Sequence, residues 1–201
     1  MEYDEGLVKA KLIRWGRYLN HYCLPAWEQL PNVGLYMEQV LILLKEYLDY
    51  LPPELKEEQF ITAATINNYV QKKFMPEPIK KRYYRVHLAY MIMICTLKHS
   101  LSIATLQKLI PVGLPEEKVK ETYTAFALRH KTTATYFADQ IAFACGPMLF
   151  DEPRTSDLTV NDTADLITAT AIVSALSRLL AEKLLLLEGK KIGDVAPEEL
   201  E

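Results

Sequence analysis

Apolar positions recur at helical spacing along most of the chain, and this periodicity predicts an all-α fold. A first helix is expected from a cap at Asn32 to Leu48, where a pair of prolines follows shortly after and stops it. Thr62 offers the cap of a second helix over residues 63–74, which has a polar outer face. Both elements read as amphipathic helices that pack on a common core.

Two prolines interrupt the helical pattern after the second helix. Pro76 and Pro78 cannot continue a helix, and residues before proline prefer extended geometry, so residues 75–83 are expected to form a tight extended loop or a small hairpin. A third helix over residues 86–99 is apolar nearly all round, which predicts a place at the centre of the core. A short fourth helix is expected over residues 102–110.

The last part of the chain has a different character. Pro115 opens a helix that is rich in Glu and Lys at its start and aromatic further on. A final helix over residues 163–187 carries an apolar heptad pattern, formed by Leu166, Val173, Leu176, Leu180 and Leu187. This pattern fits a dimer interface and also fits packing within one monomer, because the apolar face is wide.

Composition places the chain among globular proteins. Half of its 201 residues are hydrophobic and 24% are charged, so disorder is not expected except at the ends. Its start lacks the pattern of a secretory signal, and its apolar runs are far shorter than the ~20 residues that span a bilayer. Its three cysteines are widely separated and form no CxxC pair. We therefore expect a reduced, cytoplasmic protein without a membrane segment.

Positive charge is concentrated in one segment, although the whole chain has a net charge of −3. Residues 61–100 hold seven Lys or Arg and a single acid, Glu77, whereas the other 161 residues hold 16 basic and 25 acidic side chains. Such asymmetry is typical of a nucleic-acid-binding surface on an otherwise acidic protein. A solvated turn is the alternative, because runs of charge usually lie in exposed loops.

A short helix, a basic proline-containing loop and a buried helix follow one another in the order of a winged helix-turn-helix. In that arrangement one helix enters the major groove, and flanking cations neutralise phosphates. The residues expected to contact DNA are Thr62, Thr65, Asn67, Asn68, Tyr69, Lys72, Lys73, Lys80, Lys81, Arg82, Tyr83 and Arg85. Asn67 and Asn68 point about 100° apart, so we expect only one of them to read a base, and we predict that this residue is Asn68. Tyr69 and Tyr83 are equally well explained as packing residues.

Three groups of residues match, in order along the chain, the pattern of one type of DNA-binding domain. The first is a helix cap with a Thr-Ile pair, and the second is the start of the loop that follows the helix. The third is a Ser-Ile-Leu pattern, and the three groups are Thr62, Thr65 and Ile66; Phe74, Met75 and Pro78; and Ser102, Ile103 and Leu106. On these residues, 62–110 resembles the DNA-binding domain of MerR-type transcriptional regulators. The resemblance implies a recognition helix, then a wing with Lys81 and Tyr83 on its return strand, then a buried helix and another short helix.

The sequence also departs from that family. Asn67 stands where its recognition helix usually has Arg, and His87 stands where its buried helix normally starts with an acid, so the contacts of that Arg do not carry over. The stretch LPPELKEEQ is inserted before the recognition helix. With its Trp27 lead-in and its TINNYVQKK helix, the whole chain looks more like an uncharacterised bacterial family, a domain of unknown function related to MerR proteins.

No catalytic or metal-binding pattern stands out. Cys95 and His99 lie four apart on one predicted helix, but a metal site needs three or four ligands, so Cys95 is interpreted as a core thiol. The seven glycines form no phosphate-cradling motif, and no nucleophile signature is present. We therefore expect no enzymatic activity, no cofactor and no metal.

These observations predict an all-α protein with a small wing hairpin. Residues 1–31 are expected to form an N-terminal helical extension, residues 32–111 the winged helix-turn-helix, and residues 112–201 a helical region that dimerises, senses an unidentified small-molecule effector, or both. The expected function is a sequence-specific transcriptional regulator that binds double-stranded DNA as a homodimer, since a lone helix-turn-helix reads little DNA. The alternative is a winged-helix protein-interaction module without DNA binding.

Overall fold

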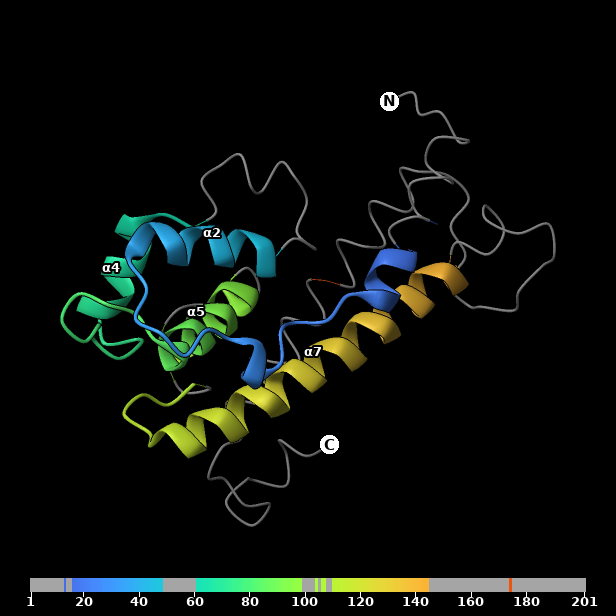
Figure 1. Cartoon of the computed structure of the whole chain (residues 1–201). Helices are drawn as coiled ribbons and strands as arrows, with labels where there is room; N and C mark the ends of the chain where they lie inside the picture. The colour runs from blue at the N-terminus through green and yellow to red at the C-terminus, as the bar shows by residue number, and fades with distance from the viewer. Residues whose placement is uncertain are drawn as a thin grey trace, which may run out of the picture.

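The computed structural model describes residues 16–48, 61–98 and 110–144, together with residues 13, 104, 106, 107 and 174 taken singly. Its named elements are η1 (Trp27–Gln29), α2 (Met37–Tyr47), α4 (Ala63–Gln71), α5 (Arg85–Leu97) and α7 (Glu116–Ala144) (Figure 1). The described part of the chain is mostly helical and contains no strand, which confirms the all-α prediction. Within it, no helix is both long and apolar enough to cross a membrane.

Helix α5 forms the centre of the core. All nine residues from His87 to Cys95 are buried, as predicted from a helix that is apolar nearly all round. Helix α2 contacts α5 and α4, and the long helix α7 contacts α5 and η1 (Figure 1). Among the described elements the short polar-faced helix α4 contacts α2, and Ala64, Asn67 and Gln71 on its other side are exposed.

Helix α2 begins later than the sequence predicts. Tyr36 precedes its first turn, and the Tyr36 N–H donates to Oε1 of Gln39 at 2.9 Å, so Asn32 is not the cap. The reason lies in Leu35, whose N–H and carbonyl both bond to the backbone of Tyr83, at 2.8 and 2.9 Å. A residue paired in this way cannot also continue a helix.

Helix α4 begins as predicted and ends early. The Thr62 hydroxyl accepts a hydrogen bond from the Thr65 N–H at 3.0 Å, which confirms the predicted cap. The helix ends at Gln71 rather than at residue 74, because Lys73 adopts a left-handed conformation with a φ of 57°. A residue in that conformation cannot extend a right-handed helix.

The segment before α2 and the helix α7 belong to the same core as the middle of the chain. The Tyr123 hydroxyl of α7 donates to the carbonyl of Pro25 at 2.7 Å, and Trp27 packs beside the Tyr123 ring. We call residues 22–36 the lead-in segment. The hydrophobic core thus includes residues on both sides of the predicted boundaries after residues 31 and 111.

Two predicted helices fall largely outside the described residues. Of the predicted helix 102–110, residues 104, 106 and 107 are helical. Of the predicted C-terminal helix 163–187, only residue 174 is described. The proposed dimer residues therefore lie outside the described part of the chain: Leu166, Val173, Leu176, Leu180 and Leu187.

Candidate nucleic-acid interface

The predicted DNA-binding loop connects α4 to α5 at one edge of the molecule, beyond α4 in the left part of the view (Figure 1). We call residues 72–85 the basic segment. Its four lysines are exposed, whereas its two arginines are half-buried: Lys72, Lys73, Lys80, Lys81, Arg82 and Arg85. The six cations thus fall into two groups, which the sequence alone does not distinguish.

A two-residue turn forms the tip of the basic segment. Ile79 and Arg82 exchange both backbone hydrogen bonds, each at 3.0 Å, around the turn residues Lys80 and Lys81. Both lysines have positive φ, 50° and 60°, which is the geometry of a type I′ hairpin turn. The pairing consists of isolated bridges, without strands in the described residues, so the predicted wing hairpin is not confirmed.

Arg82 links the basic segment to the lead-in segment by hydrogen bonds. Its Nη1 donates to the Gly34 carbonyl at 3.1 Å, and its Nη2 donates to the Tyr36 hydroxyl at 2.7 Å. Its guanidinium carbon also lies 4.2 Å from the centre of the Tyr36 ring. Arg82 was predicted to contact DNA, but two of its five N–H donors bond within the protein and its side chain is half-buried.

Arg85, the first residue of α5, has a similar role. Its Nε donates to the Leu30 carbonyl at 2.9 Å, and its guanidinium carbon lies 5.6 Å from the centre of the buried Trp27 ring. The planar guanidinium suits this combination of hydrogen bonding and ring contact better than a lysine ammonium does. Arg82 and Arg85 therefore position the basic segment.

His87 joins the basic segment to the start of α5. Its ring is only 3% exposed, and both nitrogens are used: Nδ1 accepts from the Tyr84 N–H, and Nε2 bonds to the Glu77 carbonyl, each at 3.0 Å. An N–H only donates and a carbonyl only accepts, so this pair of bonds has Nδ1 as the acceptor and Nε2 as the donor. Sequence reasoning noted His87 only as a departure, yet it occupies the capping-box position where Glu or Gln is usual.

The predicted contact residues of α4 differ in accessibility. Thr62 and Thr65 are half-buried, with their hydroxyls 2.9 Å apart at the helix start. Asn67 is exposed and Asn68 is half-buried. Of this set, Asn67 has the side chain most open to a ligand.

Two predicted tyrosines lie in the core. Tyr69 and Tyr83 are 2% and 4% exposed, and burial raises the pKa of both phenols. The structure thus places these two side chains as packing residues, which is the alternative that their aromatic character left open.

The end of α4 holds two of the lysines in fixed backbone positions. The Phe74 N–H donates to the Tyr69 carbonyl at 2.8 Å, and the Lys73 N–H donates to the Val70 carbonyl at 3.0 Å. This pair of bonds defines a Schellman motif, with Lys73 at the position where glycine is usual. Lys72 immediately precedes it and has an ordinary φ of −83°.

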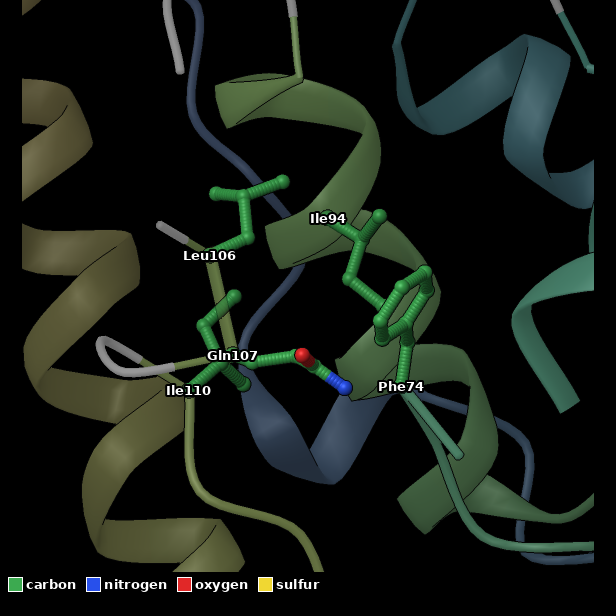
Figure 2. A pocket seen from close by; sticks show the side chains of 5 residues that line it. All are labelled: Phe74, Ile94, Leu106, Gln107 and Ile110. Atoms are coloured by element: carbon green, nitrogen blue, oxygen red, sulfur yellow. The ribbon is translucent and has the colours of Figure 1, made fainter. Parts of the chain in front are cut away.

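The end of α4 also borders a small apolar pocket. Figure 2 shows the side chains that line it, which are Phe74, Ile94, Leu106, Gln107 and Ile110. Its volume of about 10 Å³ has room for about one water molecule. This pocket is too small for an organic effector.

Metal and thiol chemistry have little support in the described residues. No group of three His, Cys, Asp or Glu side chains there could hold a metal ion. Cys95 lies fully buried in α5, and burial raises the pKa of its thiol to about 12. A buried thiol of this kind is a packing group and a poor nucleophile.

Fold and surface together define an all-α protein with a hydrogen-bonded basic segment beside the short helix α4. The chain belongs to the family described as Domain of unknown function (DUF1836), whose model matches residues 25–126. No curated protein and no solved structure matches the chain significantly. The matched range covers most of the lead-in segment, all of the basic segment and the first part of α7, and it confirms the predicted membership in a family of unknown function.

Proposed function

We propose that this protein is a winged helix-turn-helix transcriptional regulator that binds double-stranded DNA. The observation that carries the proposal is the group of four exposed lysines on one short segment: Lys72, Lys73, Lys80 and Lys81. None of them forms a salt bridge with a described residue. Such a cluster of available cations suits the phosphates of a duplex.

Helix α4 is the element that we propose for the major groove. It is short, and Ala64, Asn67 and Gln71 are exposed at helical spacing along its outer side. Asn and Gln side chains can bond bidentately to adenine in the major groove. Asn67 and Gln71 are therefore better candidates for base contacts than the half-buried Asn68. The resemblance to MerR-type regulators supports the same orientation.

Fluorescence polarisation with labelled duplexes tests this function directly. If each of the four lysines neutralises one phosphate, the logarithm of the affinity should fall with the logarithm of salt concentration with a slope of roughly −3.6. Replacing all four by Gln should abolish this dependence. A matched control is Lys45→Gln combined with Arg129→Gln, because both residues are exposed and lie outside the basic segment. We expect the control to bind like the unchanged protein.

The same assay separates DNA binding from the alternative function. Absence of binding to any duplex at about 50 mM salt, where phosphate contacts are strong, would refute DNA binding. The leading function would then be that of a protein-interaction module. Binding with no preference between the protein's own upstream DNA and an unrelated duplex would refute the sequence-specific part of the proposal alone.

Base reading is tested by single substitutions on α4. We expect Asn67→Ala to reduce the preference for the specific site by roughly 1–3 kcal/mol while leaving non-specific binding unchanged. The neighbouring Asn68→Ala is the matched control, because Asn68 is half-buried. Equal losses on specific and unrelated duplexes for Asn67→Ala would remove Asn67 from this role.

A homodimer remains part of the proposal. Two copies related by a two-fold axis would double the contacts and require a palindromic site. The proposed interface is the heptad of residues 166–187, which lies outside the described residues. Light scattering of the full chain and of Val173→Asp tests it. A full-length monomer at micromolar concentration would contradict the dimer, and an intact dimer in Val173→Asp would place the interface elsewhere.

A further inference from the structure

Three lysines of the basic segment have an unusual backbone conformation. Lys73, Lys80 and Lys81 have φ values of 57°, 50° and 60°. They are the only non-glycine residues with positive φ in the described part of the chain. The left-handed conformations among L-residues there are thus confined to lysine and to one segment.

The backbone geometry at these positions favours other residue types. Lys73 lies at the Schellman position after a helix, where glycine is usual. Lys80 and Lys81 are the two central residues of a type I′ turn, where Asn-Gly is usual. An L-residue with a β-carbon is disfavoured in the left-handed region, so lysine lowers the stability of the fold at each of these positions.

Hydrogen bonds on both sides of the lysines hold this conformation. The Phe74 N–H bonds to the Tyr69 carbonyl directly after Lys73, and Ile79 and Arg82 pair across the turn. The base of the turn is fixed in addition by backbone bonds between Tyr83 and Leu35. Unfavourable backbone conformations persist where the surroundings enforce them, and they concentrate at functional sites.

We propose that Lys73, Lys80 and Lys81 form a preorganised binding site for phosphates of a nucleic-acid backbone, at which lysine supplies positive charge at the expense of folding stability. This proposal rests on the proposed function and adds that three of its four lysines are held in a left-handed backbone conformation, which gives a physical reason for their role. The three side chains are exposed. Successive phosphates of a duplex fit such a surface better than one small anion does.

The decisive variants exchange lysine for the residues that the backbone prefers. Lys80→Asn with Lys81→Gly creates the usual type I′ pair, and Lys73→Gly creates the usual Schellman residue. We expect each variant to raise Tm, by roughly 2–6 °C, because the disfavoured conformation is relieved. We expect duplex affinity to fall roughly eightfold per lysine at about 0.1 M salt, and the salt slope to become about 0.9 smaller per lysine.

Two control variants separate charge from conformation. Lys80→Arg with Lys81→Arg keeps both the charge and the left-handed backbone, so affinity should be kept and Tm should not rise. Lys72→Asn removes a neighbouring charge at an ordinary φ of −83°. That variant should lose affinity without a gain in Tm, because no conformational cost is relieved there.

Each result has a defined meaning. A more stable Asn-Gly variant that binds duplex as tightly as the unchanged protein would overturn the site and leave the proposed function standing. If Lys80→Asn with Lys81→Gly has an unchanged or lower Tm, lysine does not lower folding stability at these positions. That part of the proposal would then be wrong, whatever the duplex affinity of the variant. If the unchanged protein binds no duplex at low salt, the proposed function itself fails, and this inference fails with it.

Discussion

At the tip of the basic segment Lys80 and Lys81 are exposed and form no salt bridge with a described residue, whereas at its base Arg82 and Arg85 are bonded to the lead-in segment. The two regions carry the same formal charge, yet only the tip offers it to a ligand. Arginine at the base uses its planar donors on carbonyl oxygens and its face on aromatic rings. A count of basic residues therefore overstates the charge that a partner would meet.

This contrast predicts that substitutions at the base and at the tip have different effects. Changes at the base should lower the free energy of unfolding, because Arg82 and Arg85 bond to the lead-in segment, whose Trp27 and Leu35 belong to the core. Changes at the tip should leave that free energy equal or higher and should act on ligand binding.

The largest effect is expected at Trp27, which lies under Arg85 and beside Tyr123. Its side chain is only 4% exposed, so Trp27→Ala leaves a cavity and should cost about 3–5 kcal/mol of unfolding free energy. Urea denaturation measures this loss. The control Val33→Ala, at a residue that is 61% exposed in the same segment, should change stability by less than about 0.5 kcal/mol. A loss below about 1 kcal/mol for Trp27→Ala would contradict the structural base.

His87 should give the next largest effect. His87→Ala removes the partner of the Tyr84 N–H and of the Glu77 carbonyl, which should cost about 1–3 kcal/mol. His87→Gln should recover part of the loss, because Gln can accept at this capping-box position. Hydrogen exchange at the Tyr84 amide should be faster in His87→Ala than in His87→Gln. Equal exchange in both would show that the ring does not hold this amide.

The parts of the fold that sequence predicts well are those determined locally. Thr62 caps α4 through a residue three positions away, and the burial of α5 follows from its own apolar composition. Arg82 and Arg85 bond to residues 48 and 55 positions away, so their spacing gave no signal of a structural role. The prolines predicted a tight loop or small hairpin over residues 75–83, but the turn at its tip was not located, because a type I′ turn is recognised from Asn and Gly and here contains two lysines.

Gly34 should show an intermediate effect. An added β-carbon would lie 2.7 Å from Cδ of Arg82 and 3.0 Å from the Tyr84 hydroxyl, so the Arg82 side chain would have to move. Gly34→Ala should therefore cost about 1–2 kcal/mol of unfolding free energy. The control is Gly16→Ala, because Gly16 is helical and an added β-carbon there meets no atom within 4 Å. The control should raise stability by about 0.5–1 kcal/mol, and an equal gain in both variants would contradict the close contact at Gly34.

The smallest effect, and the sharpest test of the comparison, comes from exchanging the two kinds of cation. Arg82→Lys and Lys81→Arg both leave the net charge unchanged, so a difference between them cannot come from overall electrostatics. Arg82→Lys loses a planar group that reaches the Gly34 carbonyl and the Tyr36 hydroxyl together, and it should cost about 1 kcal/mol. Lys81→Arg should change unfolding by less than about 0.5 kcal/mol, because Lys81 is exposed at the turn. Equal losses of unfolding free energy in urea denaturation would mean that Lys81 contributes to the fold as much as Arg82 does. The distinction between positioning arginines and available lysines would then be wrong.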